Sequence, residues 1–169
     1  MDLSYSEFQS LSHGVLRLED VIKEIKYFLE ENPDAQYSLV IGSDSQEKTE
    51  SLKNGSLTVV TAVVVHRKGF GGKYFWQKKI LPKTKTLREK IYTETLTSLS
   101  FATFFVPMLK KSLNGKSPNY NLEIHVDVGE HGETRNMIKE VVGMVVGNGF
   151  VAKIKPLAFG ASYVADKHT

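Results

Sequence analysis

Two aspartates occupy positions where a carboxylate could hold a metal ion. Asp44 lies in Gly-Ser-Asp-Ser-Gln, directly after the apolar run 37–41, and Asp127 is the last polar residue of the alternating polar and apolar run 121–128. Ligands of open α/β sheets bind outside the carboxyl ends of strands, so we expect both side chains at one edge if these strands are neighbours. Adjacent carboxylates repel each other, and a bound hard dication relieves the repulsion while both stay ionised. The pair therefore predicts a divalent-metal site.

A third carboxylate, Glu94, lies in the helix expected between these two strands. Thr86-Leu87-Arg88-Glu89 matches a capping box, which predicts that the helix begins there. Glu94 is two turns further on and shares a helical face with Ile91 and Ser98, so it should point at the sheet. A carboxylate on an inner face needs a partner, whereas Glu89 already has a structural role in the cap. Glu94 is therefore the expected third member of the acidic site.

Each aspartate also has an ordinary structural explanation. Asp favours turns, where its side chain hydrogen-bonds the nearby backbone, and both Asp44 and Asp127 precede stretches that could form one. Taken singly, neither residue decides between a turn and a ligand. Their combination with Glu94 in one consistent topology favours an acidic ligand site. The histidines show no His-x-x-x-His spacing and are not expected as ligands.

The composition is that of an ordinary globular protein. The 169 residues are 41% hydrophobic and 24% charged, which predicts a single domain over 1–169 with a real core. There is no cysteine, which excludes disulfides, thiolate nucleophiles and cysteine zinc sites, and which fits a reducing compartment. The sequence begins without a signal-peptide pattern, and its longest apolar stretch, 59–65, is far below the ~20 residues of a membrane span. We therefore expect a cytoplasmic protein without a membrane partner.

Positive charge is concentrated in one segment. Between Arg67 and Lys90 there are nine lysines and arginines, and Glu89 is the single acidic residue. Such an asymmetry favours a polyanionic partner, namely RNA, DNA or a hybrid. The residues expected to contact phosphates are Lys78, Lys79, Lys83 and Lys85. The aromatic run 74–76 within this segment could stack bases, but such a run more often has one face in the core and the other on an edge strand.

The hydrophobic pattern predicts alternating helices and strands. Apolar residues at helical spacing over 16–31 predict a helix within an N-terminal extension, 1–33. Strands are expected over 37–41, 57–66, 74–81, 121–128 and 151–154, with helices after Thr86 and after Thr134, the latter capped by that threonine. The first three strands should form an antiparallel meander, and the first, fourth and fifth should be parallel. The prediction is a five-stranded mixed sheet with helices on both faces.

These stretches together resemble the YkuK-like family of the ribonuclease H-like superfamily, whose members are predicted nucleases. The resemblance covers nearly the whole chain. It is carried by Ile-Gly-Ser-Asp-Ser-Gln at 41–46, by Ile-Tyr-Thr-Glu-Thr-Leu at 91–96, by His-Val-Asp-Val-Gly at 125–129 with the stretches after it, and by Gly-Ala-Ser-Tyr-Val-Ala-Asp-Lys-His at 160–168.

The resemblance implies a ribonuclease H-like fold and an acidic site that uses Mg²⁺ or Mn²⁺. Asp44, Glu94 and Asp127 match the strand, helix and strand carboxylates of the superfamily, and Asp166 matches its final, more variable acidic position. This chain departs from the pattern in one respect. Three residues follow Asp166, so the helix that usually carries the last ligand is at best a short stub.

The sequence thus predicts a metal-dependent nuclease in which Asp44, Glu94, Asp127 and Asp166 are catalytic metal ligands. Two metals roughly 4 Å apart would activate a water molecule and stabilise the leaving oxygen. One alternative is a nucleic-acid-binding module that retains the acidic cluster without catalysis. A second is an ATPase-like domain, suggested by Asp127-Val-Gly129; those proteins close two such domains around the nucleotide, and the length of this chain argues against that class.

Overall fold

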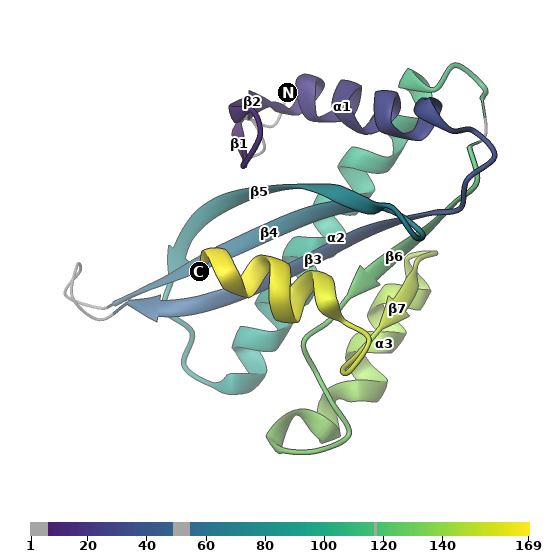
Figure 1. Ribbon diagram of the computed structural model, residues 1–169. Coiled ribbons are helices and arrows are strands. Elements are labelled where there is room, and N and C mark those ends of the chain that lie inside the picture. The colour runs from purple at the N-terminus through teal and green to yellow at the C-terminus, as the bar shows by residue number, and fades with distance from the viewer. Residues whose placement is uncertain (1–6, 49–54, 117) are drawn as a thin grey trace.

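The computed structural model describes residues 7–48, 55–116 and 118–169 (Figure 1). Within these residues seven strands form one mixed sheet in the order β2-β1-β5-β4-β3-β6-β7. The strands are β1 (Glu7–Ser10), β2 (Gly14–Arg17), β3 (Tyr37–Lys48), β4 (Ser56–Arg67), β5 (Gly71–Pro82), β6 (Tyr120–His125) and β7 (Val151–Lys153). The α-helices are α1 (Leu18–Glu31), α2 (Leu87–Ser112) and α3 (Ile138–Gly147).

The centre of the sheet is the meander β3-β4-β5, whose strands pair antiparallel along their whole length. β4 is rich in β-branched residues, which suit a strand buried on both faces. β6 pairs parallel with β3, and β7 pairs parallel with β6, as the strand–helix–strand connections predicted. The antiparallel meander and the parallel outer strands are both confirmed.

The predicted number of five strands is wrong, because two short strands precede α1. β1 and β2 form a hairpin, and β1 joins the sheet through the pair Gln9 and Trp76 on β5. Each strand has four residues, and Phe8 is the one fully buried apolar side chain among them. A strand of four residues is too short to show a clear alternation of polar and apolar residues in the sequence. Residues 7–17 therefore extend the sheet, and α1 packs on the main core, as Ile25 and Leu29 show.

β3 is longer than the apolar run 37–41 predicted. It continues through the polar residues Gly42–Lys48, which pair with β4 up to Lys48 and Ser56. The ladder to β4 keeps this stretch extended although its side chains are polar. Asp44 is therefore inside a strand rather than just after one. Asn54-Gly55 is a strong turn pair in the sequence, and Asn54 lies outside the described residues.

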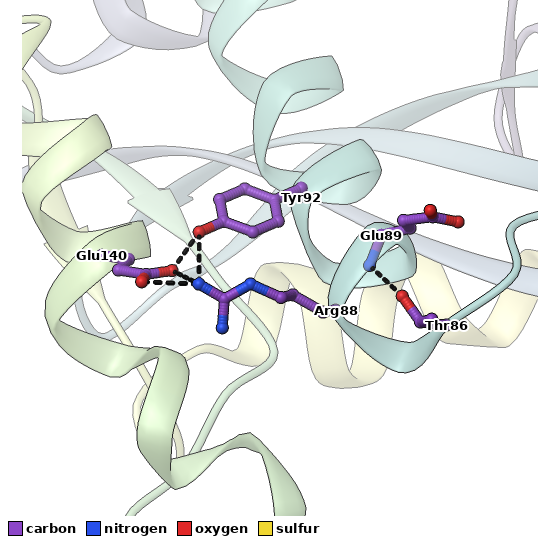
Figure 2. Close-up of polar contacts among 5 residues, drawn as sticks. All are labelled: Thr86, Arg88, Glu89, Tyr92 and Glu140. Carbon is purple, nitrogen blue, oxygen red and sulfur yellow. Dashed lines mark hydrogen bonds and ion pairs between the residues drawn. The ribbon is translucent and has the colours of Figure 1, made fainter.

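The start of α2 confirms the predicted cap (Figure 2). The backbone N–H of Glu89 donates to Thr86 Oγ1 at 3.1 Å. The carboxylate of Glu89 accepts the backbone N–H of Lys85 at 2.6 Å. A standard capping box would use the N–H of Thr86, one residue later. Pro107 does not interrupt the helix, which continues to Ser112.

The start of α3 differs from the prediction. The 3₁₀ segment η2 (Glu133–Met137) precedes it, and α3 has no side-chain cap. The Thr134 hydroxyl instead accepts the N–H of Gly129 at 3.2 Å, and so closes the loop after β6. The competing loop contact takes the hydroxyl that a cap would need.

The sheet has helices on both faces, as expected. The main core lies between one face and helices α1, α2 and α3. A smaller core of Val60, Ala62, Trp76 and Ala165 lies on the other face, beneath the π-helical segment η3 (Gly160–Ala165) and the 3₁₀ turn η4 (Asp166–His168). Figure 1 shows this C-terminal segment in front of the sheet and α2 behind it.

An exposed cluster joins α2 to α3 (Figure 2). Glu140 on α3 accepts hydrogen bonds from the Tyr92 hydroxyl and from the Arg88 guanidinium, the latter at 2.6 Å to Oε1. Both partners lie within the first six residues of α2. The cluster therefore fixes the first turns of α2, which also carry Glu94. No helix in the described part of the chain is long and apolar enough to cross a membrane.

Candidate acidic site

Asp44 and Asp127 lie at matching positions on neighbouring strands. The last paired residues of β3 and β6 are Gly42 and His125. Asp44 and Asp127 each follow two residues later. β3 continues past this point paired with β4 alone, so beside Asp44 the edge of β3 that faces β6 has no strand partner among the described residues.

The side chains along β3 alternate between the two faces of the sheet. Ser43 accepts a hydrogen bond from Ser98 of α2 at 2.8 Å, and Ser45 donates to Glu94 Oε1 at 2.6 Å. Asp44, between these two serines, is therefore directed to the opposite face, which the C-terminal segment covers. Glu94 and Asp44 thus lie on opposite faces of the sheet, beside the stretch of β3 that is not paired with β6.

Glu94 is buried, with 4% of its surface exposed. Besides the Ser45 hydroxyl, its Oε1 has Lys90 Nζ at 3.7 Å, one helical turn earlier. Burial raises the pKa of the Glu94 carboxyl to about 7, against the lowering effects of Ser45 and Lys90. The negative charges of Asp44 and Asp127 add to the rise. The surroundings of Glu94 therefore favour its protonated form more than water does.

Burial and like charges also disfavour the ionised form of Asp44, on the other face of the sheet. It is 8% exposed, and burial raises the pKa of its carboxyl to about 6. The positive charge of Lys90 lowers this pKa, while the charges of Asp166 and Asp127 raise it further. The four carboxylates therefore interact electrostatically in one region, although each comes from a different segment of the chain.

Asp127 is held by two donors from the C-terminal part of the chain. Ser162 Oγ donates to Asp127 Oδ1 at 2.5 Å, and Lys155 Nζ lies 3.1 Å from the same oxygen. Ser162 belongs to η3, and the exposed Asp166 begins η4. The C-terminal segment that carries Asp166 is thus hydrogen-bonded directly to Asp127.

His125 fixes this C-terminal segment against the sheet. The N–H of Gly160 donates to His125 Nδ1 at 3.0 Å, so the ring proton is on Nε2, which donates to Glu123 Oε2 at 3.0 Å. Burial lowers the pKa of His125 and favours this neutral form. Gly160 has no room for a side chain, because a Cβ would lie 2.5 Å from Val40 Cγ1. The segment carrying Ser162 and Asp166 therefore begins at a fixed point.

Carboxylate oxygens are the donors that Mg²⁺ and Mn²⁺ prefer, so the chemistry of this residue set fits such an ion. In the ranges 7–48, 55–116 and 118–169, no three His, Asp or Glu side chains already lie close enough together to hold a metal. In this arrangement Glu94 and Asp127 instead contact hydroxyl and ammonium groups of the protein.

The sequence did not identify the residues that hold the carboxylates. Lys90 precedes Glu94 by four residues on one helix, a spacing that does signal a contact. Ser45 is adjacent to Asp44, but its contact with α2 depends on the unexpected length of β3. Lys155 and Ser162 reach Asp127 through tertiary packing, for which the sequence gives no signal.

The basic segment is divided between the two faces of the sheet. In the strand register, Asp44 is paired with Val60, and Val60 with Lys78, so Lys78 lies in line with Asp44 on one face. Lys79 occupies the next row, in line with Ser45, and so lies on the face of α2. Lys83 is paired with Glu47 at 2.9 Å, and Lys85 is exposed before α2.

The aromatic run 74–76 is divided in the same way. Phe75 belongs to the main core, whereas Tyr74 and Trp76 face the C-terminal segment. The His168 ring stacks on Trp76 with centroids 3.7 Å apart, and His168 Nε2 lies 3.3 Å from the Tyr74 hydroxyl. These contacts anchor the end of the chain on β5.

The chain is similar to known proteins over most of its length. A family model described as "Ribonuclease H-like" matches residues 20–169. The chain belongs to the ribonuclease H-like family. It is also 30% identical over 170 residues to the uncharacterized protein YkuK of Bacillus subtilis (strain 168), with 96% of each chain covered. No solved structure gives a significant match. Membership in the ribonuclease H-like family confirms the resemblance and its mixed α/β fold.

The raised pKa values make the stability of this ribonuclease H-like protein depend on pH. The folded state keeps protons on Asp44 and Glu94 that the unfolded chain, with pKa values of 3.8 and 4.5, has already released. Their contribution to the free energy of unfolding is thus largest below about pH 4 and falls as pH rises to about 7.

We predict that Glu94→Gln stabilises the metal-free protein at pH 8, because the amide keeps the Ser45 hydrogen bond and removes a buried charge. Each pKa unit corresponds to about 1.4 kcal/mol, and each kcal/mol to roughly 2–4 °C in Tm for a chain of this size. Thermal melts in chelator from pH 4 to 8 measure this, with the exposed Glu133→Gln as control. A Glu94→Gln variant that melts below wild type at pH 8 would contradict the prediction.

Proposed function

We propose that this ribonuclease H-like protein is a nuclease that hydrolyses phosphodiester bonds of nucleic acid with Mg²⁺ or Mn²⁺. The observation that carries the proposal is the electrostatic interaction of Asp44, Glu94, Asp127 and Asp166, which come from four separate segments of the chain. Two of these carboxyls are buried and have raised pKa values. We assign all four residues as metal ligands and catalytic residues.

A buried acidic group without a compensating ion is unfavourable at neutral pH, because burial and like charges both disfavour the ionised form. A purely structural role would be better served by Asn or Gln, which keep the hydrogen bonds and carry no charge. Perturbed carboxyls of this kind cluster at functional sites. When bound, a divalent ion supplies an activated water and stabilises the leaving oxygen.

The neighbouring residues have separate roles in this proposal. Ser45 and Ser162 orient the carboxylates of Glu94 and Asp127 through short hydrogen bonds. Lys90 and Lys155 partly neutralise the same two groups in the metal-free protein. Both ammonium groups then lie beside the phosphodiester when substrate is bound, where they attract its negative charge.

Nucleic acid is the proposed substrate because of the basic segment and the family. Lys78 lies in line with Asp44 on the same face, so it is the member of the segment that we place nearest to the reacting phosphate. Lys79, Lys83 and Lys85 remain proposed phosphate contacts further away. The absence of cysteine in the sequence fits our further proposal that the protein works in the cytoplasm.

A non-catalytic nucleic-acid-binding module is the second candidate. The observation that favours it is the spacing of the carboxylates, since no three His, Asp or Glu side chains in the described ranges are preassembled for a metal. Such a module would bind nucleic acid through the basic segment and would not need Asp127.

We predict that the protein binds Mn²⁺ and that Asp44→Asn/Asp127→Asn weakens binding by at least about 100-fold, above the usual effect of outer-shell changes. Calorimetry on wild type, this double variant and Glu133→Gln measures the affinity. Assays on labelled RNA, DNA and hybrid duplexes with Mn²⁺, Mg²⁺ or chelator measure hydrolysis. A double variant that binds Mn²⁺ as tightly as the wild type would refute the assignment of Asp44 and Asp127 as metal ligands. Nucleic-acid binding without hydrolysis, unchanged in Asp127→Asn, would favour the binding module.

The basic segment is tested by the salt dependence of nucleic-acid binding. Losing one phosphate contact lowers the slope of log K against log salt by about 0.7–0.9. We predict this change for Lys78→Gln, a larger one when Lys78, Lys79, Lys83 and Lys85 are all replaced by Gln, and none for Lys110→Gln on the exposed surface of α2. An unchanged slope in the fourfold variant would show that these lysines contact no phosphate.

A further inference from the structure

A pocket of about 650 Å³ lies beside the acidic site. This volume is within the range of roughly 300–1,000 Å³ that is usual for small-ligand sites. The pocket lies between the loop after β6 and the end of β7 with the loop after it. Its lining residues are Gly129, Glu130, His131, Ala152, Lys153, Ile154, Lys155, Pro156 and Leu157.

The two walls of the pocket are joined by backbone hydrogen bonds. The Val126 N–H donates to the Lys153 carbonyl at 2.9 Å, and the Lys155 N–H donates to the Val128 carbonyl at 2.9 Å. The packing is close, since a Cβ on Gly129 would lie 3.3 Å from Lys155 Cβ. These contacts hold the lining segments at the end of the sheet, next to Asp127.

Lys155 connects the pocket with the acidic site. Its side chain lines the pocket, and its Nζ lies 3.1 Å from Asp127 Oδ1. Lys153 and His131 add two further basic groups to the lining, against the single carboxylate of Glu130. Ile154, Pro156 and Leu157 supply apolar surface, and Leu157 is 63% exposed. The lining thus combines the ammonium groups of Lys153 and Lys155 with apolar side chains.

We propose that this pocket binds one nucleotide unit of the substrate, next to the phosphodiester at the acidic site. The inference rests on the proposed nuclease function and adds a binding position to it. Lys153 and Lys155 pair with phosphate, and the base packs against Ile154, Pro156 and Leu157. A nucleotide suits this lining because it joins an anion to a planar apolar surface, whereas inorganic phosphate uses only the lysines.

Binding of UMP, AMP, uridine and inorganic phosphate to the full chain tests the proposal. Calorimetry and amide NMR shifts in chelator give the affinities and the location without any metal. Lys153→Gln and Leu157→Ala change the pocket and leave the four carboxylates in place. Their matched controls are Lys110→Gln on α2 and Val151→Ala at the start of β7. Mn²⁺ affinity is measured separately on every variant.

We expect the nucleotides to bind at least about tenfold more tightly than phosphate or uridine, which is 1.4 kcal/mol or more. The amides of Gly129, Lys153 and Leu157 should shift, and the Lys153→Gln/Leu157→Ala double variant should lose at least about tenfold in nucleotide affinity. The controls should bind as wild type does.

Three results would overturn the inference: no nucleotide binding, equal affinity for phosphate and nucleotide, or unchanged affinity in the double variant. If Mn²⁺ binding and hydrolysis are nevertheless as proposed, such a result rejects nucleotide binding in the pocket and leaves the proposed nuclease function standing. If nucleotide binds in the pocket while Mn²⁺ does not bind, the nuclease function fails and the nucleotide site remains.

Discussion

Burial of negative charge beside β3 is the constraint on which the site depends. Asp44 and Glu94 lie on opposite faces of the same stretch of this strand, past its pairing with β6, and both are buried. Low exposure and mutual repulsion raise both pKa values, to about 6 and about 7. The surrounding serine and lysine contacts offset part of this destabilisation, and a divalent ion would offset more of it.

The rest of the fold buries that stretch of β3 while one of its edges has no strand partner in the described part of the chain. β4 pairs with β3 as far as Lys48, whereas the pairing with β6 ends at Gly42. α2 covers one face and supplies Glu94. The C-terminal segment covers the other face, and the hydrogen bond from Gly160 to His125 fixes where it begins. Since Ser162 and Asp166 follow from that point, the position of His125 determines how Asp127 is held.

The sequence predicted an element correctly where a strong local pattern of residues marks it. The β-branched run of β4 and the capping box before α2 are local patterns, and the structure contains both. Parallel pairing of β3 and β6 follows from connectivity, so the matching positions of Asp44 and Asp127 could be anticipated. The four-residue strands β1 and β2 are too short to show a pattern.

Other features depend on contacts that no local pattern records. Residues 42–48 look like a loop because they are polar, yet the ladder to β4 holds them as a strand. The hydroxyl of Thr134 bonds the loop at Gly129 instead of capping α3. For the same reason Lys155 was not expected at Asp127, and the division of Lys78 and Lys79 between two faces became visible only with the register.

The titration of Glu94 with and without Mg²⁺ tests the account most directly. The side-chain carboxyl is followed by ¹³C NMR from pH 4 to 9, and Glu94→Gln identifies its signal. Without metal the midpoint should lie at about 7. With saturating Mg²⁺ it should fall to the ordinary value of 4.5 or below, because the ion stabilises the ionised form. An unchanged midpoint, or one already at 4.5 without metal, would contradict the claim that buried repulsion prepares these carboxylates for a metal.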